Sequence, residues 1–167
     1  MSGAEGVDTA RAAVITVSTS CAEGTREDTG GPRLRELAGQ LGAELAGSEV
    51  IRDDRELIAA RLRHWVDEEG VGLVLTTGGT GFGPYDLTPE ATRDVIEREA
   101  PGIAEAMRAA SREHTPNWML SRAVAGIRGS ALIVNFPGNP RSIGQVGAAI
   151  AAALPHALDL LAGRHPH

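Results

Sequence analysis

A glycine-rich segment in the middle of the chain has the composition of a phosphate-binding loop. The run Thr76-Thr77-Gly78-Gly79-Thr80-Gly81-Phe82-Gly83 places four glycines in six positions. Glycine backbone turns tightly and can point several N–H groups at one anion. The alternative is a tight connection whose backbone requires positive φ. However, four glycines destabilise the fold because they raise the entropy of the unfolded chain, and a binding role would explain why the chain keeps them. We therefore expect a phosphorylated ligand on Thr76, Gly78, Gly79, Thr80 and Gly81.

Two common phosphate-binding motifs do not match this loop. A Walker loop beginning at Gly78 requires lysine after Gly83, where the chain has Pro84. The dinucleotide-binding fingerprint requires its third glycine one residue later than Gly83, and it follows the first strand of the fold. The loop is therefore expected to bind phosphate through another motif.

Two aspartates are the candidate metal ligands. Asp86 follows the glycine-rich loop, and a carboxylate beside a phosphate site usually holds a metal ion. Asp53 lies between an expected strand and an expected helix, so it can reach the same edge of the sheet. Asp53 also fits an N-terminal capping pair with Glu56, three residues later, and this structural interpretation stays open.

A third polar turn, NFPGNPRS at residues 135–142, ends one expected strand and begins a helix. Asn139 or Ser142 can direct polar groups at a ligand, and the N-terminus of a helix favours an anion. Ordinary turn chemistry at the start of a helix explains the same residues equally well.

These candidate residues need a scaffold, and the chain alternates short apolar runs with helical patterns. Strands are predicted at residues 12–18, 49–52, 71–76, 124–128 and 131–136, the last two as a hairpin. Helical patterns cover a stripe from Leu34 to Leu45, residues 54–69, two pieces of 103–123 interrupted at Thr115-Pro116, and one long helix after Pro140. A further helix is expected to begin at Thr88 as its cap, with Pro89 at the first helical position.

Strands separated by helices pair in parallel through right-handed crossovers. The hairpin makes the sheet mixed. The predicted fold is therefore α/β, with three αβα layers around a mostly parallel central sheet. Since ligands bind beyond the carboxyl ends of such strands, the loops beginning at Ser18, Thr76 and Asn135 should meet at one rim.

Composition limits the class of protein. With 167 residues and 42% hydrophobic residues, we expect a flexible leader at residues 1–10 and a single domain at 11–167. A net charge of -6 disfavours nucleic acid as a partner. Cys21 is the only cysteine, which excludes an intramolecular disulfide and favours the reducing cytoplasm. No apolar run reaches the roughly 20 residues that cross a bilayer, so no membrane association is expected.

Taken together, these segments resemble the molybdopterin-binding domain of bacterial molybdopterin adenylyltransferases, of their pathway homologues and of gephyrin-like proteins. The resemblance covers nearly the whole chain. It runs through VITVS (14–18), EDTGGP (27–32), VIRDDRELI (50–58), LTTGGTGFGPYDLTPEAT (75–92) and MLSRAVAGIRGSALIVNFPGNP (119–140). The central motif, a double-glycine loop followed by Asp and Thr-Pro-Glu, is the most specific part.

The resemblance implies a role in molybdenum cofactor biosynthesis: Mg²⁺-dependent transfer of AMP from ATP to the terminal phosphate of molybdopterin. It implies that Asp53 and Asp86 hold Mg²⁺ and that the glycine loop holds phosphate. The residues that it adds to the nucleotide or pterin pocket are Ser121, Pro137, Gly138 and Asn139, with Arg122 or Arg128 as a source of positive charge. It also implies a homotrimer and contact with other enzymes of the pathway.

The chain departs from the family pattern at two positions. Ser18 is followed by Thr19 where the family often has Asp, and Tyr85 stands where the family commonly has Arg. Because these substitutions remove charges, a second interpretation stays open: a carrier that binds molybdopterin but does not transfer AMP to it. A nucleotide pyrophosphatase is a third alternative, but competence-damage-like proteins of that type carry an additional domain.

Overall fold

The buried apolar runs form the central sheet in a computed structural model, which describes residues 9–164. The sheet has the strand order β2-β1-β3-β6-β5-β4. Its strands are β1 (Arg11–Val17), β2 (Glu44–Ile51), β3 (Leu73–Thr77), β4 (Arg98–Glu99), β5 (Ala125–Arg128) and β6 (Ala131–Phe136). Strand β1 pairs in parallel with β2 and β3, and β3 pairs in parallel with β6, whereas β5 runs antiparallel to β6 and β4. The predicted mixed sheet with its hairpin is confirmed.

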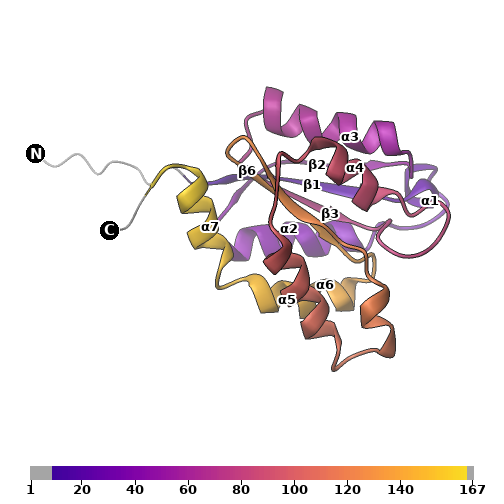
Figure 1. Cartoon of the computed structure of the whole chain (residues 1–167). Helices are drawn as coiled ribbons and strands as arrows, with labels where there is room; N and C mark the ends of the chain where they lie inside the picture. Colours follow the sequence, from indigo (N-terminus) through magenta and orange to yellow (C-terminus); the bar gives the residue numbers. More distant parts are fainter. Residues whose placement is uncertain (1–8, 165–167) are drawn as a thin grey trace, which may run out of the picture.

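Helices cover both faces of this sheet (Figure 1). On one face lie α3 (Arg55–Arg63), which continues as a π-helical turn (His64–Glu68), and α4 (Thr88–Val95). On the other face lie α2 (Gly30–Gln40), α5 (Pro101–Ser111) and α6 (Pro140–Ile150), with α7 (Leu154–Leu161) at its end. Shorter helical turns are α1 (Thr19–Ala22) and a 3-10 turn (Pro116–Leu120).

Strand β1 shows why the sequence produces two cores. Because side chains of a strand alternate between the faces of a sheet, Ala12 and Val14 join the core under α2 and α6. Ala13 and Ile15 join the core under α3. All four side chains are fully buried. A continuous apolar run is thus the pattern of a central strand with helices on both faces.

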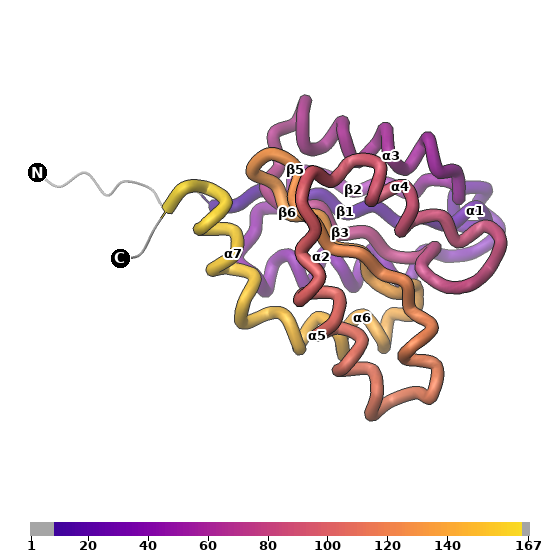
Figure 2. Tube along the Cα trace, viewed as in Figure 1, coloured from indigo at the N-terminus to yellow at the C-terminus, as the bar shows by residue number. Residues whose placement is uncertain are grey.

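The parallel strands bring their carboxyl ends to one side of the molecule. Figure 2 shows β1, β3 and β6 running toward the side that carries α1, while α7 lies at the opposite side. The residues that follow these strands therefore meet at one rim.

Two predictions of secondary structure are wrong, and one strand was not predicted. Leu45 lies in β2 with 41% of its surface exposed, because α2 ends at Gln40 and Gly42 reverses the chain at a φ of +79°. The helix after Pro140 is two helices, since Pro155 fits only the first turn of a new helix, α7. The edge strand β4 has two residues and no apolar pattern that predicts it.

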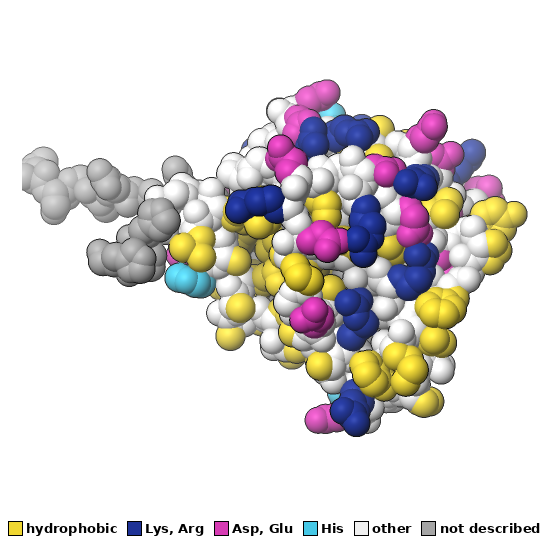
Figure 3. Space-filling view, in the orientation of Figure 1, with side chains coloured by type: hydrophobic (Ala, Val, Ile, Leu, Met, Phe, Trp, Pro, Cys, Tyr) yellow, Lys and Arg dark blue, Asp and Glu magenta, His cyan; other side chains and the backbone are white. Residues whose placement is uncertain are grey.

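Figure 3 shows arginine and acidic side chains interspersed over one face of the protein. Surface ion pairs of the described residues include Arg55–Asp94 and Arg93–Glu99. No single helix within residues 9–164 is long and apolar enough to cross a membrane; α6 and α7 satisfy the length and composition only as a pair bent by 66°. Of the expected leader, residues 1–8 lie outside the described part, and the single-domain assignment of 11–167 stays a prediction.

Candidate active site

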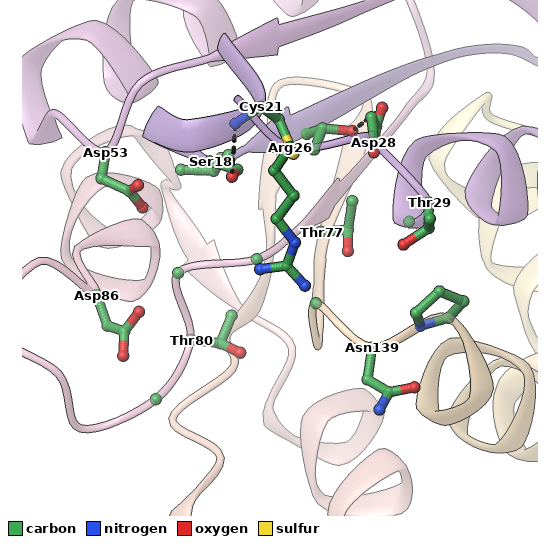
Figure 4. Close-up of a pocket in the computed structure, with 18 of the residues that line it drawn as sticks. Ser18, Cys21, Arg26, Asp28, Thr29, Asp53, Thr77, Thr80, Asp86 and Asn139 are labelled. Carbon is green, nitrogen blue, oxygen red and sulfur yellow. Dashed lines mark hydrogen bonds between the residues drawn. The ribbon is translucent and has the colours of Figure 1, made fainter. Parts of the chain in front are cut away.

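A cleft of about 480 Å³ opens at the carboxyl ends of β1, β3 and β6 (Figure 4). Its walls are the end of β1 with Ser18 and Cys21, the segment 26–30, the glycine loop 77–81 and the turn 138–140, together with Asp53 and Asp86. The prediction that the loops beginning at Ser18, Thr76 and Asn135 converge on one rim is confirmed.

The glycine loop is tied to the protein through its carbonyl groups. The hydroxyl of Thr88 donates to the carbonyl oxygen of Gly78 at 2.9 Å, and the Thr88 N–H donates to that of Gly79 at 3.1 Å. The N–H groups of Gly79, Thr80 and Gly81 donate no hydrogen bond within the described part of the chain. Three successive N–H groups are therefore available to an anion in the cleft.

Thr88 does not act as the predicted cap of its helix. It is the first residue of α4 and is fully buried, and the preceding Leu87 provides no side-chain cap. Because its hydroxyl is used on Gly78, Thr88 couples the start of α4 to the loop.

The capping prediction for Asp53 is wrong, because the neighbouring Asp54 caps α3 through the N–H of Leu57 at 2.8 Å. Asp53 instead faces the cleft. Its Oδ2 accepts hydrogen bonds from the N–H and the hydroxyl of Thr19 at 2.9 and 3.0 Å, and the Thr19 hydroxyl accepts from the Asp53 N–H at 3.0 Å. Thr19 thus fixes the orientation of this carboxylate without adding a charge.

Asp86, like Asp53, is oriented by a hydrogen bond to its Oδ2 atom. Its Oδ2 accepts a hydrogen bond from the N–H of Gly83 at 2.8 Å. A Cβ at Gly81 or at Gly83 would lie 2.9 Å from the same oxygen, so both glycines make room for this carboxylate. In both Asp53 and Asp86, Oδ1 accepts no hydrogen bond from residues 9–164.

These two carboxylates fit a magnesium ion that is shared with a phosphate ligand. Mg²⁺ prefers oxygen ligands and is usually bound by one or two carboxylates plus substrate phosphates. The described residues contain no group of three or more His, Cys, Asp or Glu side chains that could hold a metal alone. Asp53 and Asp86 line the same cleft as the loop N–H groups, so a phosphate bound there could complete the coordination.

Arg122 stabilises the glycine loop by hydrogen bonds from outside the cleft. Its guanidinium donates to the carbonyl oxygens of Gly81 and Asp86, both at 2.7 Å, and forms a two-pronged ion pair with Glu90 at 2.8 and 3.0 Å. Arg128 pairs with Asp67 at 2.7 Å. Neither guanidinium lines the cleft, so the expectation that Arg122 or Arg128 supplies positive charge there finds no support.

We expect Glu90→Gln to destabilise the fold at neutral pH by about 1–2 kcal/mol. This is less than the roughly 1.5–3 kcal/mol of a buried hydrogen bond to a charged group, because the side chains of Arg122 and Glu90 are 35% and 29% exposed and solvent screens the pair. The hydrogen bond from Arg122 lowers the pKa of Glu90. A lowered pKa means that this stability is present above the pKa of the unfolded carboxyl, about 4.3, and is lost as the pH falls through the folded pKa. Urea unfolding at pH 7 and at a series of lower pH values should therefore show a difference between wild type and variant that is largest at pH 7 and narrows as the pH falls.

Glu105→Gln is the matched control, because Glu105 lies exposed on α5 and forms no ion pair within residues 9–164. It should leave the free energy of unfolding unchanged at every pH of the series. An equal effect of the two variants at pH 7 would mean that Arg122 does not stabilise the loop through Glu90.

Three of the predicted site residues do not line the cleft. Thr76 is buried in the sheet and accepts a hydrogen bond from the side-chain amide of Asn135 at 3.1 Å. Pro137 and Ser121 line a separate cavity of about 120 Å³ instead. The carbonyl oxygen of Pro137 accepts from the Thr77 hydroxyl at 2.7 Å, which joins β3 to the turn. The predicted residues that do line the cleft are Gly78, Gly79, Thr80, Gly81, Gly138, Asn139, Asp53 and Asp86.

Sequence reasoning gave no site role to the segment before α2, although EDTGGP (27–32) is one of the segments that carry the family resemblance. Asp28 lines the cleft, and its two oxygens accept from the Gly31 N–H and the Thr16 hydroxyl, both at 2.9 Å. An Asp three residues before a helical Gly-Pro pair is a capping pattern that could have identified it. Arg26 also points into the cleft (Figure 4). It lies in an irregular charged loop, where no pattern distinguishes it.

Comparison with known proteins is consistent with this geometry. Residues 13–156 match the family described as "Probable molybdopterin binding domain". The molybdopterin adenylyltransferase of Helicobacter pylori (strain J99) is 38% identical over 91% of this chain and 88% of its own length. The molybdenum cofactor synthesis protein cinnamon of Drosophila melanogaster is 40% identical over 89% of this chain, which spans only 25% of that protein.

A solved structure confirms the fold. The molybdopterin biosynthesis enzyme MoaB of Thermus thermophilus superposes with a TM-score of 0.87 at 44% identity, covering 93% of this chain and 98% of its own. The family match, the identity to relatives of similar length and the shared fold agree: this chain belongs to the family of molybdopterin-binding domains.

Proposed function

We propose that this protein is a molybdopterin adenylyltransferase of molybdenum cofactor biosynthesis, transferring AMP from ATP to the terminal phosphate of molybdopterin and releasing pyrophosphate. One observation carries the proposal: Gly79, Thr80, Gly81, Asp53 and Asp86 line one cleft, and their backbone N–H groups (in the loop) and Oδ1 atoms (in the carboxylates) form no hydrogen bond within residues 9–164. A relative that carries this name is 38% identical over 91% of the chain.

The reaction forms a bond between a phosphate oxygen of molybdopterin and the α-phosphorus of ATP, and it breaks the bond from that phosphorus to the bridging oxygen of pyrophosphate. The two reacting groups are anions, so their repulsion must be offset. Mg²⁺ would supply this positive charge, held by Asp53 and Asp86. The N–H groups of Gly79, Thr80 and Gly81 would orient phosphate oxygens. No covalent intermediate on the protein is required.

The two departures from the family pattern are compatible with this assignment. Thr19 holds Asp53 through the reciprocal hydrogen bonds described above, so an Asp at that position is not needed to orient the carboxylate. Tyr85 is 73% exposed and lines a second cavity next to Asp53. Tyr85 does not line the cleft itself, so the substitution leaves the loop N–H groups and both carboxylates in place.

The test is incubation of the full chain with molybdopterin, ATP and Mg²⁺, followed by detection of adenylated pterin and pyrophosphate. We expect both products in equal amounts, and none when Mg²⁺ is removed by EDTA. Binding of molybdopterin without product would identify a carrier instead. Release of pyrophosphate without the pterin would indicate a nucleotide pyrophosphatase.

We further propose that the protein acts in the cytoplasm as a homotrimer and contacts other enzymes of the pathway. Exposed apolar side chains near the loop and the 3-10 turn are available for subunit contacts: Phe82, Tyr85, Met119 and Leu120. Light scattering of the purified chain measures its oligomeric state, and a monomer at micromolar concentration would contradict the trimer.

A further inference from the structure

The cleft contains one cation among many acidic groups. Arg26 is the only basic side chain among the described residues that line it, and the acidic ones are Glu27, Asp28, Asp53 and Asp86. Despite these neighbours, the guanidinium of Arg26 forms no ion pair and donates no hydrogen bond to residues 9–164. Both oxygens of Asp28 are used by Gly31 and Thr16, so this neighbouring carboxylate is already occupied.

A guanidinium without partners is unusual in this protein. All 16 basic residues are arginines. Most of those within residues 9–164 are paired with carboxylates or backbone carbonyls, as in Arg55–Asp94, Arg61–Glu49 and Arg128–Asp67. The guanidinium groups of Arg52, Arg98 and Arg141 form no ion pair or hydrogen bond within residues 9–164 either. That of Arg35 contacts only the hydroxyl of Ser48 and that of Arg112 only the ring of Trp118, and none of these five arginines lines the cleft.

The guanidinium of Arg26 forms no ion pair with either candidate metal ligand, Asp53 or Asp86. Figure 4 shows its side chain extending into the cleft between Thr77 and Thr80, while Asp53 and Asp86 lie to one side of it. A fork of N–H donors in this position matches the oxygens of a phosphate, which guanidinium groups bind through two parallel hydrogen bonds. The cleft thus has two places for positive charge, one at Arg26 and one at the carboxylate pair.

We propose that Arg26 is a positioning residue that binds the terminal phosphate monoester of the acceptor and orients it toward the α-phosphate held at Asp53 and Asp86. This inference rests on the proposed function for the identity of the acceptor. It gives the cleft a cation that can contact a phosphate directly. Thr80, buried beside it with a hydroxyl that has no hydrogen bond within residues 9–164, adds a donor to the same phosphate.

The experiment compares Arg26→Gln, Arg26→Lys and wild type for binding of molybdopterin and of dephosphorylated molybdopterin, followed by fluorescence of the pterin. Wild type should bind the phosphorylated form more tightly. A hydrogen-bonded charge pair contributes enough that Arg26→Gln should weaken this binding by about 10- to 100-fold. It should leave binding of the dephosphorylated form unchanged, and Arg26→Lys should restore part of the loss. In the transfer assay the KM for molybdopterin should rise while the KM for ATP stays the same.

Arg98→Gln is the matched control, since Arg98 lies exposed on the edge strand β4, outside the cleft. It should bind both pterins like wild type. Equal loss of both pterins in Arg26→Gln, or no loss of either, would overturn the inference, and a thermal unfolding curve separates misfolding from lost contacts. If wild type transfers no AMP but Arg26→Gln loses its preference for the phosphorylated pterin, the proposed function fails and the role of Arg26 stands.

Discussion

Replacing Asp86 by asparagine should lower the rate of AMP transfer by at least about 100-fold, because a metal ion stabilises the charge of the transition state by several kcal/mol. The change removes the charge but keeps the shape of the side chain. The amide oxygen can still accept the hydrogen bond from Gly83, so the melting temperature should change little. Initial rates over a range of Mg²⁺ concentrations, with calorimetry of both proteins, measure the two quantities.

A matched control for this charge removal is Asp54→Asn. Asp54 lies one residue from the other proposed ligand, but its carboxylate caps α3 through the N–H of Leu57. Asparagine caps helices about as well as aspartate, so both stability and turnover should be preserved. Unchanged turnover of Asp86→Asn at saturating Mg²⁺ would remove Asp86 from the mechanism. Equal losses in Asp86→Asn and Asp54→Asn would indicate a general effect of charge instead.

Much of the scaffold follows from local patterns. The apolar run at residues 12–18 predicts a strand buried on both faces, and β1 is such a strand because helices cover both sides of it. The Pro116 interruption and the hairpin of β5 and β6 are likewise local features. The helical prediction for Leu45 is wrong because an apolar residue at helical spacing also fits a strand, and only the turn at Gly42 decides between them.

The candidate site could be predicted in part, because its residues come from loops whose convergence follows from parallel pairing. The roles of adjacent aspartates could not be assigned from spacing alone. Asp53 and Asp54 both fit a helix cap, and the choice depends on Thr19, 34 residues earlier in the chain, which holds Asp53 in the cleft. The position of Arg26 in the cleft and the hydrogen bonds from Arg122 to the glycine loop depend in the same way on how distant segments come together.

Replacing Gly78 by alanine should destabilise the fold by about 2–5 kcal/mol. Gly78 has a φ of +94°, and a side chain in that region costs about 1–2 kcal/mol. A Cβ there would also lie 2.4 Å from the carbonyl oxygen of Val17, at the end of β1. Since a strand in the middle of the sheet cannot move freely, this overpacking should add about 1–3 kcal/mol. Urea unfolding of both proteins measures the difference.

Gly42→Ala separates the two contributions, because Gly42 has a φ of +79° and no atom within 4 Å of the added Cβ. It should cost only the backbone term, about 1–2 kcal/mol. If Gly78→Ala costs no more than Gly42→Ala, the loop relaxes away from Val17 without penalty. If it costs more, the tight-connection interpretation of the glycine loop holds at Gly78. Gly78 then serves the tight connection after β3, and the N–H groups of Gly79, Thr80 and Gly81, which donate to nothing within residues 9–164, remain for phosphate.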